Sequence, residues 1–141
     1  MFRIAMIVGL FVLAGAQPAQ SQSAPGHVYL ALHWKANPGS EAAYNQAYWQ
    51  VVRPVWGEAM RQGNIVSFLD LSKNTGDTRD ASHLILVEFE GWEAYGNFNQ
   101  SLERASQAVF GRPYAEVSAE RFVPFRTAVR SEVYVAPPGG M

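Results

Sequence analysis

The sequence predicts an α+β domain in which a four-stranded antiparallel sheet carries two main helices on one face. Stretches that alternate apolar and polar residues, as strands do, are interspersed with stretches that repeat apolar residues every three or four positions, as helices do. Along the chain they follow in the order strand, helix, strand, strand, helix, strand. This order is the split βαβ arrangement, in which neighbouring strands pair antiparallel.

The composition indicates one compact domain. The chain has 141 residues, of which 48% are hydrophobic and 16% are charged, enough to bury a core in a single domain. The formal net charge is −1 with no basic cluster, so a nucleic-acid partner is not expected. There is no cysteine, which excludes disulfide bonds and thiol catalysis. Aromatic residues make up 13% of the chain and are the main candidates for ligand contacts.

Residues 1–23 have the pattern of a signal peptide. Arg3 gives a positive start, residues 4–16 form an apolar run, and small residues suited to cleavage follow. The run is shorter than the about 20 residues that span a bilayer. We therefore expect cleavage and a periplasmic or secreted protein with no membrane association afterwards, with a single domain at residues 24–136 and a flexible tail at 137–141. The alternative is an uncleaved membrane anchor.

The first strand is expected over residues 27–35, where alternation separates two sets of side chains. One set is Val28, Leu30, Leu32 and Trp34; the other is His27, Tyr29, Ala31, His33 and Lys35. Because both sets contain apolar residues, we expect both faces of this strand to be at least partly covered.

The longest helix is expected between Ser40, which suits the N-cap, and Gly63, which suits the left-handed position after a helix end. Pro54 lies inside it and cannot donate a backbone hydrogen bond. We therefore expect a kink at this proline. A break into two helices at Arg53 is the alternative.

Both main helices carry more apolar surface than the sheet alone requires. In the first, Trp49, Trp56 and Met60 form a second stripe that must face a pocket, a partner or another helix. The second helix is expected to begin at Trp92. Its single apolar face gathers Trp92, Tyr95, Phe98, Leu102, Ala105 and Val109.

The middle strands are expected at residues 64–71 and 82–90, joined by a polar loop at 72–81. The second of them is apolar on both faces, which favours an interior place in the sheet. The acidic residues near the loop do not have the spacing of an EF-hand, so a solvated loop is predicted instead of a calcium site. A short helix at 113–122 and a last strand at 127–135 complete the domain.

The open face of this sheet is too apolar to stay in water, so a homodimer formed through the sheet is expected. Three stretches then resemble the dimeric α/β-barrel superfamily. They are the opening strand Val-Tyr-Leu-Ala-Leu-His-Trp-Lys, the turn Asn-Pro-Gly-Ser-Glu, and the run Val-Glu-Phe-Glu-Gly-Trp-Glu-Ala-Tyr into the second helix. The resemblance covers about residues 28–135. It implies a ferredoxin-like fold and two sheets paired face to face in a dimeric barrel.

The superfamily resembled here includes antibiotic-biosynthesis-type monooxygenases, haem-degrading enzymes, lactone isomerases, NIPSNAP-like proteins and stress-responsive barrels. For the cofactor-free monooxygenase and haem-degrading members, the resemblance implies an Asn, a Trp and a His around the pocket. Trp92 fills the Trp role, while His33 stands where the Asn would be expected. The second helix has no His and carries Tyr95, Asn97, Phe98 and Asn99 instead.

The residues themselves suggest one catalytic candidate and several ligand contacts. His33 is the candidate base or ligand, because imidazole titrates near neutral pH. Arg130 shares a face of the last strand with Glu132 and is expected to approach the row that bears His33. The candidate pocket walls are the aromatic residues Trp49, Trp56, Trp92 and Tyr95. The plainer interpretations are an exposed histidine at a strand end, a structural ion pair and core packing.

No metal or other cofactor is predicted, since the three histidines lack the local spacing of a metal site. The favoured function is binding of an apolar or aromatic small molecule by an exported dimeric barrel. The first alternative is a cofactor-independent enzyme of monooxygenase or isomerase type. The second is a structural module of the envelope, with its aromatic residues used in the core and the dimer interface.

Overall fold

The computed structural model describes residues 26–73 and 81–136. The predicted signal peptide, most of the polar loop and the predicted tail lie outside the described residues, so these expectations stay predictions. None of the described helices combines the length and the hydropathy of a membrane span.

The sheet has the predicted order and direction. Its strands are β1 (Val28–Ala36), β2 (Ser67–Ser72), β3 (His83–Phe89) and β4 (Arg126–Val135). They lie in the order β2-β3-β1-β4, and every neighbouring pair is antiparallel. The two central strands, β1 and β3, supply most of the buried sheet residues, because both are paired on each side. The predicted α+β arrangement is confirmed.

The long helix has three segments: α1 (Glu41–Ala47), a π-helical turn η1 (Tyr48–Val52) and α2 (Arg53–Arg61). The backbone remains helical through Pro54, so the alternative of two separate helices is wrong. The irregularity that proline imposes takes the form of the wider π turn just before it. This place is physically reasonable, because the proline ring conflicts with the carbonyl four residues earlier, which belongs to η1.

The two ends of the long helix differ in how well they match expectation. Gly63 has a φ of 75°, the left-handed conformation predicted for it. Ser40 makes no capping hydrogen bond with its side chain, so that part of the prediction is wrong. Its backbone is not extended as an N-cap usually is; instead its amide donates to the carbonyl of Asn37 at 2.8 Å, which closes the preceding turn.

The predicted second helix is two helices, α3 (Trp92–Gly96) and α4 (Phe98–Phe110). The interruption at Asn97 has φ −91° and ψ 4°, outside the helical region. The expected single apolar face is therefore wrong: Trp92 is 58% exposed, while Phe98 is buried. The short third helix is confirmed as α5 (Tyr114–Arg121), followed by a 3-10 turn η2 (Val123–Phe125).

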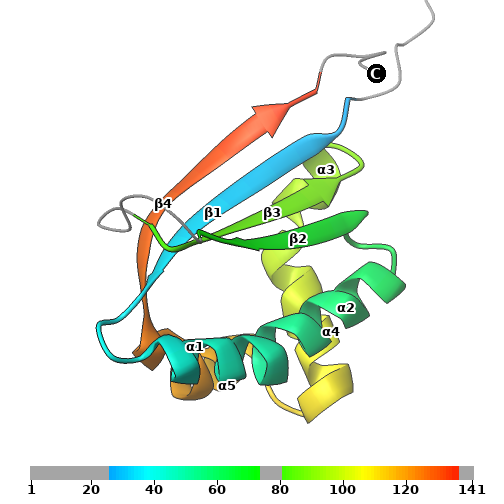
Figure 1. Ribbon diagram of the computed structural model, residues 1–141. Coiled ribbons are helices and arrows are strands. Elements are labelled where there is room, and N and C mark those ends of the chain that lie inside the picture. Colours follow the sequence, from blue (N-terminus) through cyan, green and yellow to red (C-terminus); the bar gives the residue numbers. More distant parts are fainter. Residues whose placement is uncertain (1–25, 74–80, 137–141) are drawn as a thin grey trace, which may run out of the picture.

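The helices cover one face of the sheet and leave the other open (Figure 1). β1 follows the predicted alternation, with its even-numbered residues directed to the helices. The hydrophobic core lies between the two layers and is rich in aromatic side chains. Its large members include Leu30, Trp34, Tyr44, Trp56, Ile85, Phe89, Phe98, Leu102 and Phe122.

Candidate ligand-binding site

The predicted site residues divide between the two faces of the sheet. His33 pairs with Arg130 across β1 and β4, on the open face. Glu132 lies on the same face and joins them: its Oε2 is 2.9 Å from His33 Nε2 and 3.3 Å from Arg130 Nε. The predicted approach of Arg130 to His33 is thus found, in the form of a charged cluster. This cluster lies on the side of the sheet away from the helices.

A second polar cluster lies at the other end of the open face, around Glu88. Its carboxylate is 2.6 Å from His27 Nδ1 and accepts hydrogen bonds from Tyr29 at 3.1 Å and Ser67 at 2.6 Å. The hydrogen bonds from Ser67 and His27 hold the pKa of Glu88 below its ordinary value. Within the ranges described, no group of His, Asp and Glu side chains is arranged to hold a metal ion.

Trp49 and Trp92 lie outside the space between the sheet and the helices. Trp49 is 59% exposed, and the guanidinium of Arg53 lies 4.5 Å from the centre of its ring. The π turn explains part of this result, because Trp49 belongs to it and the 3.6-residue spacing of an ordinary helix does not hold there. Trp92 is displaced from the expected face by the interruption after α3.

Trp56 and Tyr95, by contrast, line a cavity of about 440 Å³ between the helices and the sheet, which is partly open to solvent and is called the interior cavity here. The cavity wall is formed by residues of β1, β4, α2, α3, α4 and α5. Its members are Leu30, Leu32, Trp34, Trp56, Tyr95, Gly96, Phe98, Asn99, Leu102, Tyr114, Ser118, Arg126 and Ser131. Most of this wall is apolar or aromatic, with a few polar groups.

Trp56 is the centre of the aromatic wall. Its ring packs edge to face against Trp34, Phe68 and Phe98, with centroids 6.3, 5.7 and 5.5 Å away. Its indole Nε1 donates a hydrogen bond to the hydroxyl of Tyr114 at 3.3 Å. Burial raises the pKa of Tyr114, so this hydroxyl is neutral near physiological pH. These contacts fix the aromatic wall in one orientation.

Arg126 is the cavity residue that the sequence analysis missed. Its guanidinium carbon lies 4.2 Å from the centre of the Trp34 ring and 5.0 Å from that of Phe122. Its Nε atom is buried and has no hydrogen-bond partner in the described chain. Burial lowers the pKa of Arg126, although an arginine side chain stays charged in proteins. Simple alternation along β4 would place Arg126 on the open face with Arg130. A register shift opposite His33 and Trp34 reverses the alternation, so that Arg126, which pairs with Ala36, lies on the helix side.

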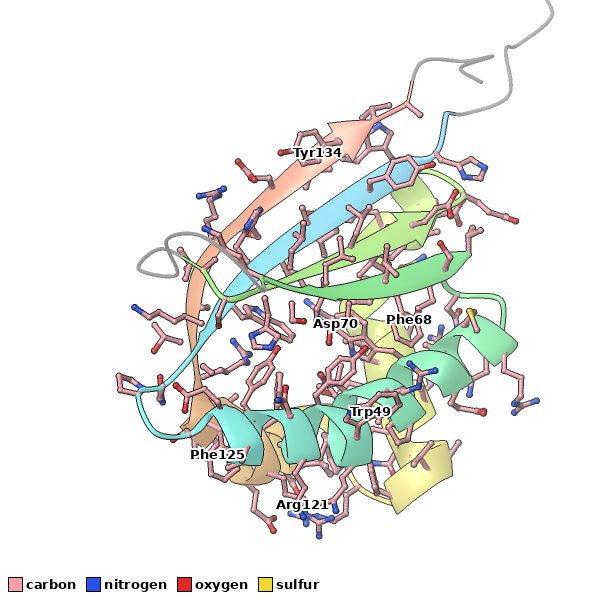
Figure 2. All side chains as sticks on the ribbon, in the orientation of Figure 1. Trp49, Phe68, Asp70, Arg121, Phe125 and Tyr134 are labelled. Atoms are coloured by element: carbon pink, nitrogen blue, oxygen red, sulfur yellow. The ribbon has the colours of Figure 1, made fainter. Side chains whose placement is uncertain are left out.

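Two more buried polar atoms in the described ranges lack a hydrogen-bond partner, the Tyr44 hydroxyl and Asp70 Oδ1. Figure 2 shows Asp70 reaching from β2 toward the helices. The pKa of Tyr44 is raised by burial and by the nearby charge of Asp70, while Arg126 acts to lower it. Burial raises the pKa of Asp70 as well. Tyr44 is therefore within electrostatic reach of both other groups.

Phe122 connects these polar groups to the aromatic wall. Its ring centroid lies 5.4 Å from that of Tyr44 and 5.0 Å from that of Trp34. The Tyr44 ring also packs against the ring of His83, with centroids 4.1 Å apart. His83 is buried, which lowers its pKa, and its Nδ1 is 2.9 Å from Ser82 Oγ. Among the described residues, the helix side of the sheet therefore holds a continuous aromatic layer and three buried polar atoms without hydrogen-bond partners.

The comparisons with known proteins concern the fold. No protein-family model and no curated protein matches the chain. A conserved protein of unknown function from Bacteroides thetaiotaomicron superposes with a TM-score of 0.50 at 10% identity, covering 80% of this chain and 100% of that one. SnoaB, a cofactor-independent oxygenase from Streptomyces nogalater, superposes with a TM-score of 0.51 at 15% identity, covering 79% of this chain and 94% of that one.

At such identities the likeness shows the fold alone, since one fold serves many functions. The ferredoxin-like fold is confirmed. The resemblance to the dimeric α/β-barrel superfamily, inferred from the sequence, therefore holds at the level of the fold.

Proposed function

We propose that this protein binds a flat apolar or aromatic small molecule that carries a hydrogen-bond acceptor, such as a carboxylate or an enolate. The observation that supports this function most directly is the interior cavity of about 440 Å³ with Arg126 in its wall. Ligand cavities typically occupy roughly 300–1,000 Å³ and combine apolar walls with a few polar groups. The lining of this cavity has that composition, with Trp34, Trp56 and Phe98 as its large flat surfaces.

Arg126 gives the cavity its preference for an acceptor. A buried donor without a partner costs free energy, and a cationic donor costs more than a neutral one. An acidic ligand oxygen that reaches the Arg126 guanidinium from the cavity forms a charge-assisted hydrogen bond, which is among the stronger contacts a protein makes. Such a contact would offset part of the cost of burying the charge in the free protein. The stacking of the guanidinium on Trp34 holds it in place for this contact.

A homodimer is part of the proposal, formed through the open face of the sheet. Leu69 and Leu71 on β2 are 52% and 46% exposed there, next to the partly buried Leu84 and Leu86 of β3. Contiguous apolar surface of this kind is usually covered in solution. In this dimer the clusters around Glu88 and Glu132 lie at the interface and determine how the two copies align. His33 then belongs to the interface and has no part in the interior cavity.

Turnover of the ligand is the second candidate function, and Asp70 is the observation that favours it. SnoaB, which shares this fold, is a cofactor-independent oxygenase. In chemistry without a cofactor, a side chain of the protein has to serve as the general base. Asp70 lies on the helix side of the sheet, partly buried, with an oxygen that accepts no hydrogen bond in the described chain. Its raised pKa brings it closer to the range useful for a general base. In this proposal Asp70 takes the place of His33 as the candidate base, and the ligand must extend beyond the interior cavity to reach it, because Asp70 is not among the residues that line the cavity.

Export remains part of the proposal through residues 1–23, whose pattern is that of a signal peptide. N-terminal sequencing of the protein recovered outside the cytoplasm tests it directly. A mature chain that begins near Ala24 supports export, and a chain that retains Met1 favours the membrane anchor.

The binding proposal is tested with 1-naphthoate and its uncharged analogue 1-naphthylmethanol. Both are expected to quench the fluorescence of the interior tryptophans and raise the melting temperature, because each binds only the folded chain. At a free concentration 100 times the dissociation constant, the stabilisation is about 2.7 kcal/mol. The carboxylate is expected to bind about tenfold more tightly, from its charge-assisted hydrogen bond.

The matched variants are Arg126→Met and Arg130→Met, which remove arginines from opposite faces of the same strand. The first is expected to abolish the preference for naphthoate over the alcohol, and the second to leave it unchanged. If neither compound changes the fluorescence or the melting temperature, the binding function is refuted and the envelope-module alternative takes its place. Oxygen consumption with 1-hydroxy-2-naphthoate, compared between the wild type and Asp70→Asn, tests turnover separately.

A further inference from the structure

A second hollow lies on the surface where β3 passes into α3. Its volume is about 620 Å³. The lining comes from the turn between β3 and α3, from α3 and α4 and the residue between them, and from the turn after α2. Its members are Asn64, Glu90, Gly91, Trp92, Glu93, Ala94, Asn97, Gln100, Ser101 and Arg104. This hollow shares no lining residue with the interior cavity, so a ligand bound here would be independent of the proposed interior ligand.

Trp92 is the one large aromatic side chain of this hollow, and it is 58% exposed. Its indole packs at 83° against Tyr95, with ring centroids 5.7 Å apart, which fixes its orientation. Trp49 is exposed to the same extent, but a guanidinium lies over its ring. No such cation is found over Trp92 among the described residues, so an indole surface is open to a ligand.

The polar lining offers donors and acceptors in close succession. Asn64, Asn97 and Gln100 each carry an amide, which both donates and accepts. Arg104 is held in place, since its Nη2 donates to Asn64 Oδ1 at 3.1 Å and to Ser101 Oγ at 3.3 Å. Its guanidinium is part of the lining. The acceptors are completed by the carboxylates of Glu90 and Glu93.

This combination identifies the chemistry of the ligand. The lining carries both signs of charge, so it does not select a strongly anionic or a strongly cationic molecule. A purely apolar molecule would cover the amides of Asn97 and Gln100 and the two carboxylates without giving them partners. A saccharide suits both the indole and the polar part of the lining. The C–H face of a sugar ring packs on an indole, and the sugar hydroxyls both donate and accept hydrogen bonds. We propose that this hollow is a saccharide-binding site with Trp92 as its stacking platform.

The test uses the whole mature protein and three tetrasaccharide probes: cellotetraose, maltotetraose and chitotetraose. Binding is measured by isothermal titration calorimetry and by saturation-transfer NMR, which identifies the sugar protons in contact with the protein. At least one probe is expected to bind, and Trp92→Ala is expected to weaken that binding at least tenfold. Asn97→Leu is expected to weaken it as well, by removing an amide while leaving the indole in place.

Trp49→Ala is the matched control, because it removes an equally exposed tryptophan from a different surface. It is expected to leave saccharide binding unchanged. The proposal is overturned if none of the three probes binds, or if Trp49→Ala reduces binding as much as Trp92→Ala. It is also overturned if Trp92→Ala lowers the mass measured by light scattering while binding is unchanged, because Trp92 then belongs to an interface between protein chains.

Discussion

The guanidinium of Arg126 lies 4.2 Å from the ring centre of Trp34, with its Nε buried and without a hydrogen-bond partner in the described chain. The stacking compensates only part of the cost of burying the charge, since an interaction of this kind contributes on the order of 1 kcal/mol. Tyr44 and Asp70, which also carry unpartnered atoms, lie on the same side of the sheet. Groups that cost stability in the free protein are characteristic of sites that serve function, and variants of these residues can show this directly.

Tyr44→Phe is expected to be as stable as the wild type or more stable by about 1 kcal/mol, because it removes a buried hydroxyl that has no partner. The ring contacts with His83 and Phe122 are kept. Urea unfolding followed by circular dichroism measures the difference. Tyr114→Phe is the control, since its hydroxyl accepts the hydrogen bond from Trp56 and its loss is expected to destabilise. A loss of stability in Tyr44→Phe would show that its hydroxyl has a structural partner.

Asp70 is expected to make the protein less stable as the pH rises. Burial raises its folded-state pKa above the ordinary 3.8, so between the two values the folded chain binds more protons than the unfolded chain. The contribution of Asp70 is therefore most favourable below pH 3.8 and is lost as the pH rises through the folded pKa. Asp70→Asn removes this dependence. Urea denaturation at a series of pH values is expected to show that the free energy of unfolding of the variant increases relative to that of the wild type as the pH approaches neutrality.

Equal pH dependence in the wild type and Asp70→Asn would contradict this assignment, because the carboxyl would then have the same pKa in both states. A second carboxylate, Glu88, is expected to give stability the opposite pH dependence.

Glu88 is expected to stabilise the protein at neutral pH and to lose this effect in acid. Hydrogen bonds from Ser67 and His27 lower its folded-state pKa below the ordinary 4.5. Its contribution is thus complete above pH 4.5 and disappears as the pH falls through the folded pKa. Glu88→Gln is expected to be less stable than the wild type at neutral pH and to approach it in acid. If Glu88→Gln remains less stable than the wild type at low pH by the same amount, Glu88 acts through packing instead.

The sequence predicted the faces of the sheet better than the contents of the site. Alternation along β1 correctly separated Leu30 and Trp34 from His33. The expected pairing of the first and last strands correctly brought Arg130 close to His33. Such patterns are local, and they hold wherever the backbone is regular. The errors fall where it is irregular: at Trp49, in the π turn, and at Trp92, before the interruption at Asn97.

Arg126 shows a second limit. A charged residue at the start of a strand is usually solvated, and nothing near it in the sequence indicates that Trp34 and Phe122 lie against it. These contacts join residues far apart in the chain, so only the packed structure reveals them. The same is true of Asp70, which lies on the helix side of the edge strand β2, within electrostatic reach of Tyr44 and Tyr48 of the long helix.

The open face of the sheet provides the last prediction, that Leu69→Lys separates the proposed dimer. Leu69 is 52% exposed on β2, opposite the partly buried Leu86 of β3. A lysine placed there would bury an unpaired charge in each copy at the interface. The cost is about 3 kcal/mol or more, a change of at least roughly a hundredfold in the dimer dissociation constant. Light scattering is expected to give about twice the chain mass for the wild type and the mass of one chain for the variant.

Val109→Lys is the control for this experiment. Val109 is 38% exposed and belongs to α4 in the helix layer, so the same substitution there adds a charge outside the proposed interface. Its mass is expected to match that of the wild type. Monomeric wild-type protein at micromolar concentration would refute the dimer outright. A dimer that persists in Leu69→Lys but dissociates in Val109→Lys would move the interface to the helices, and the clusters around Glu88 and Glu132 would then face solvent.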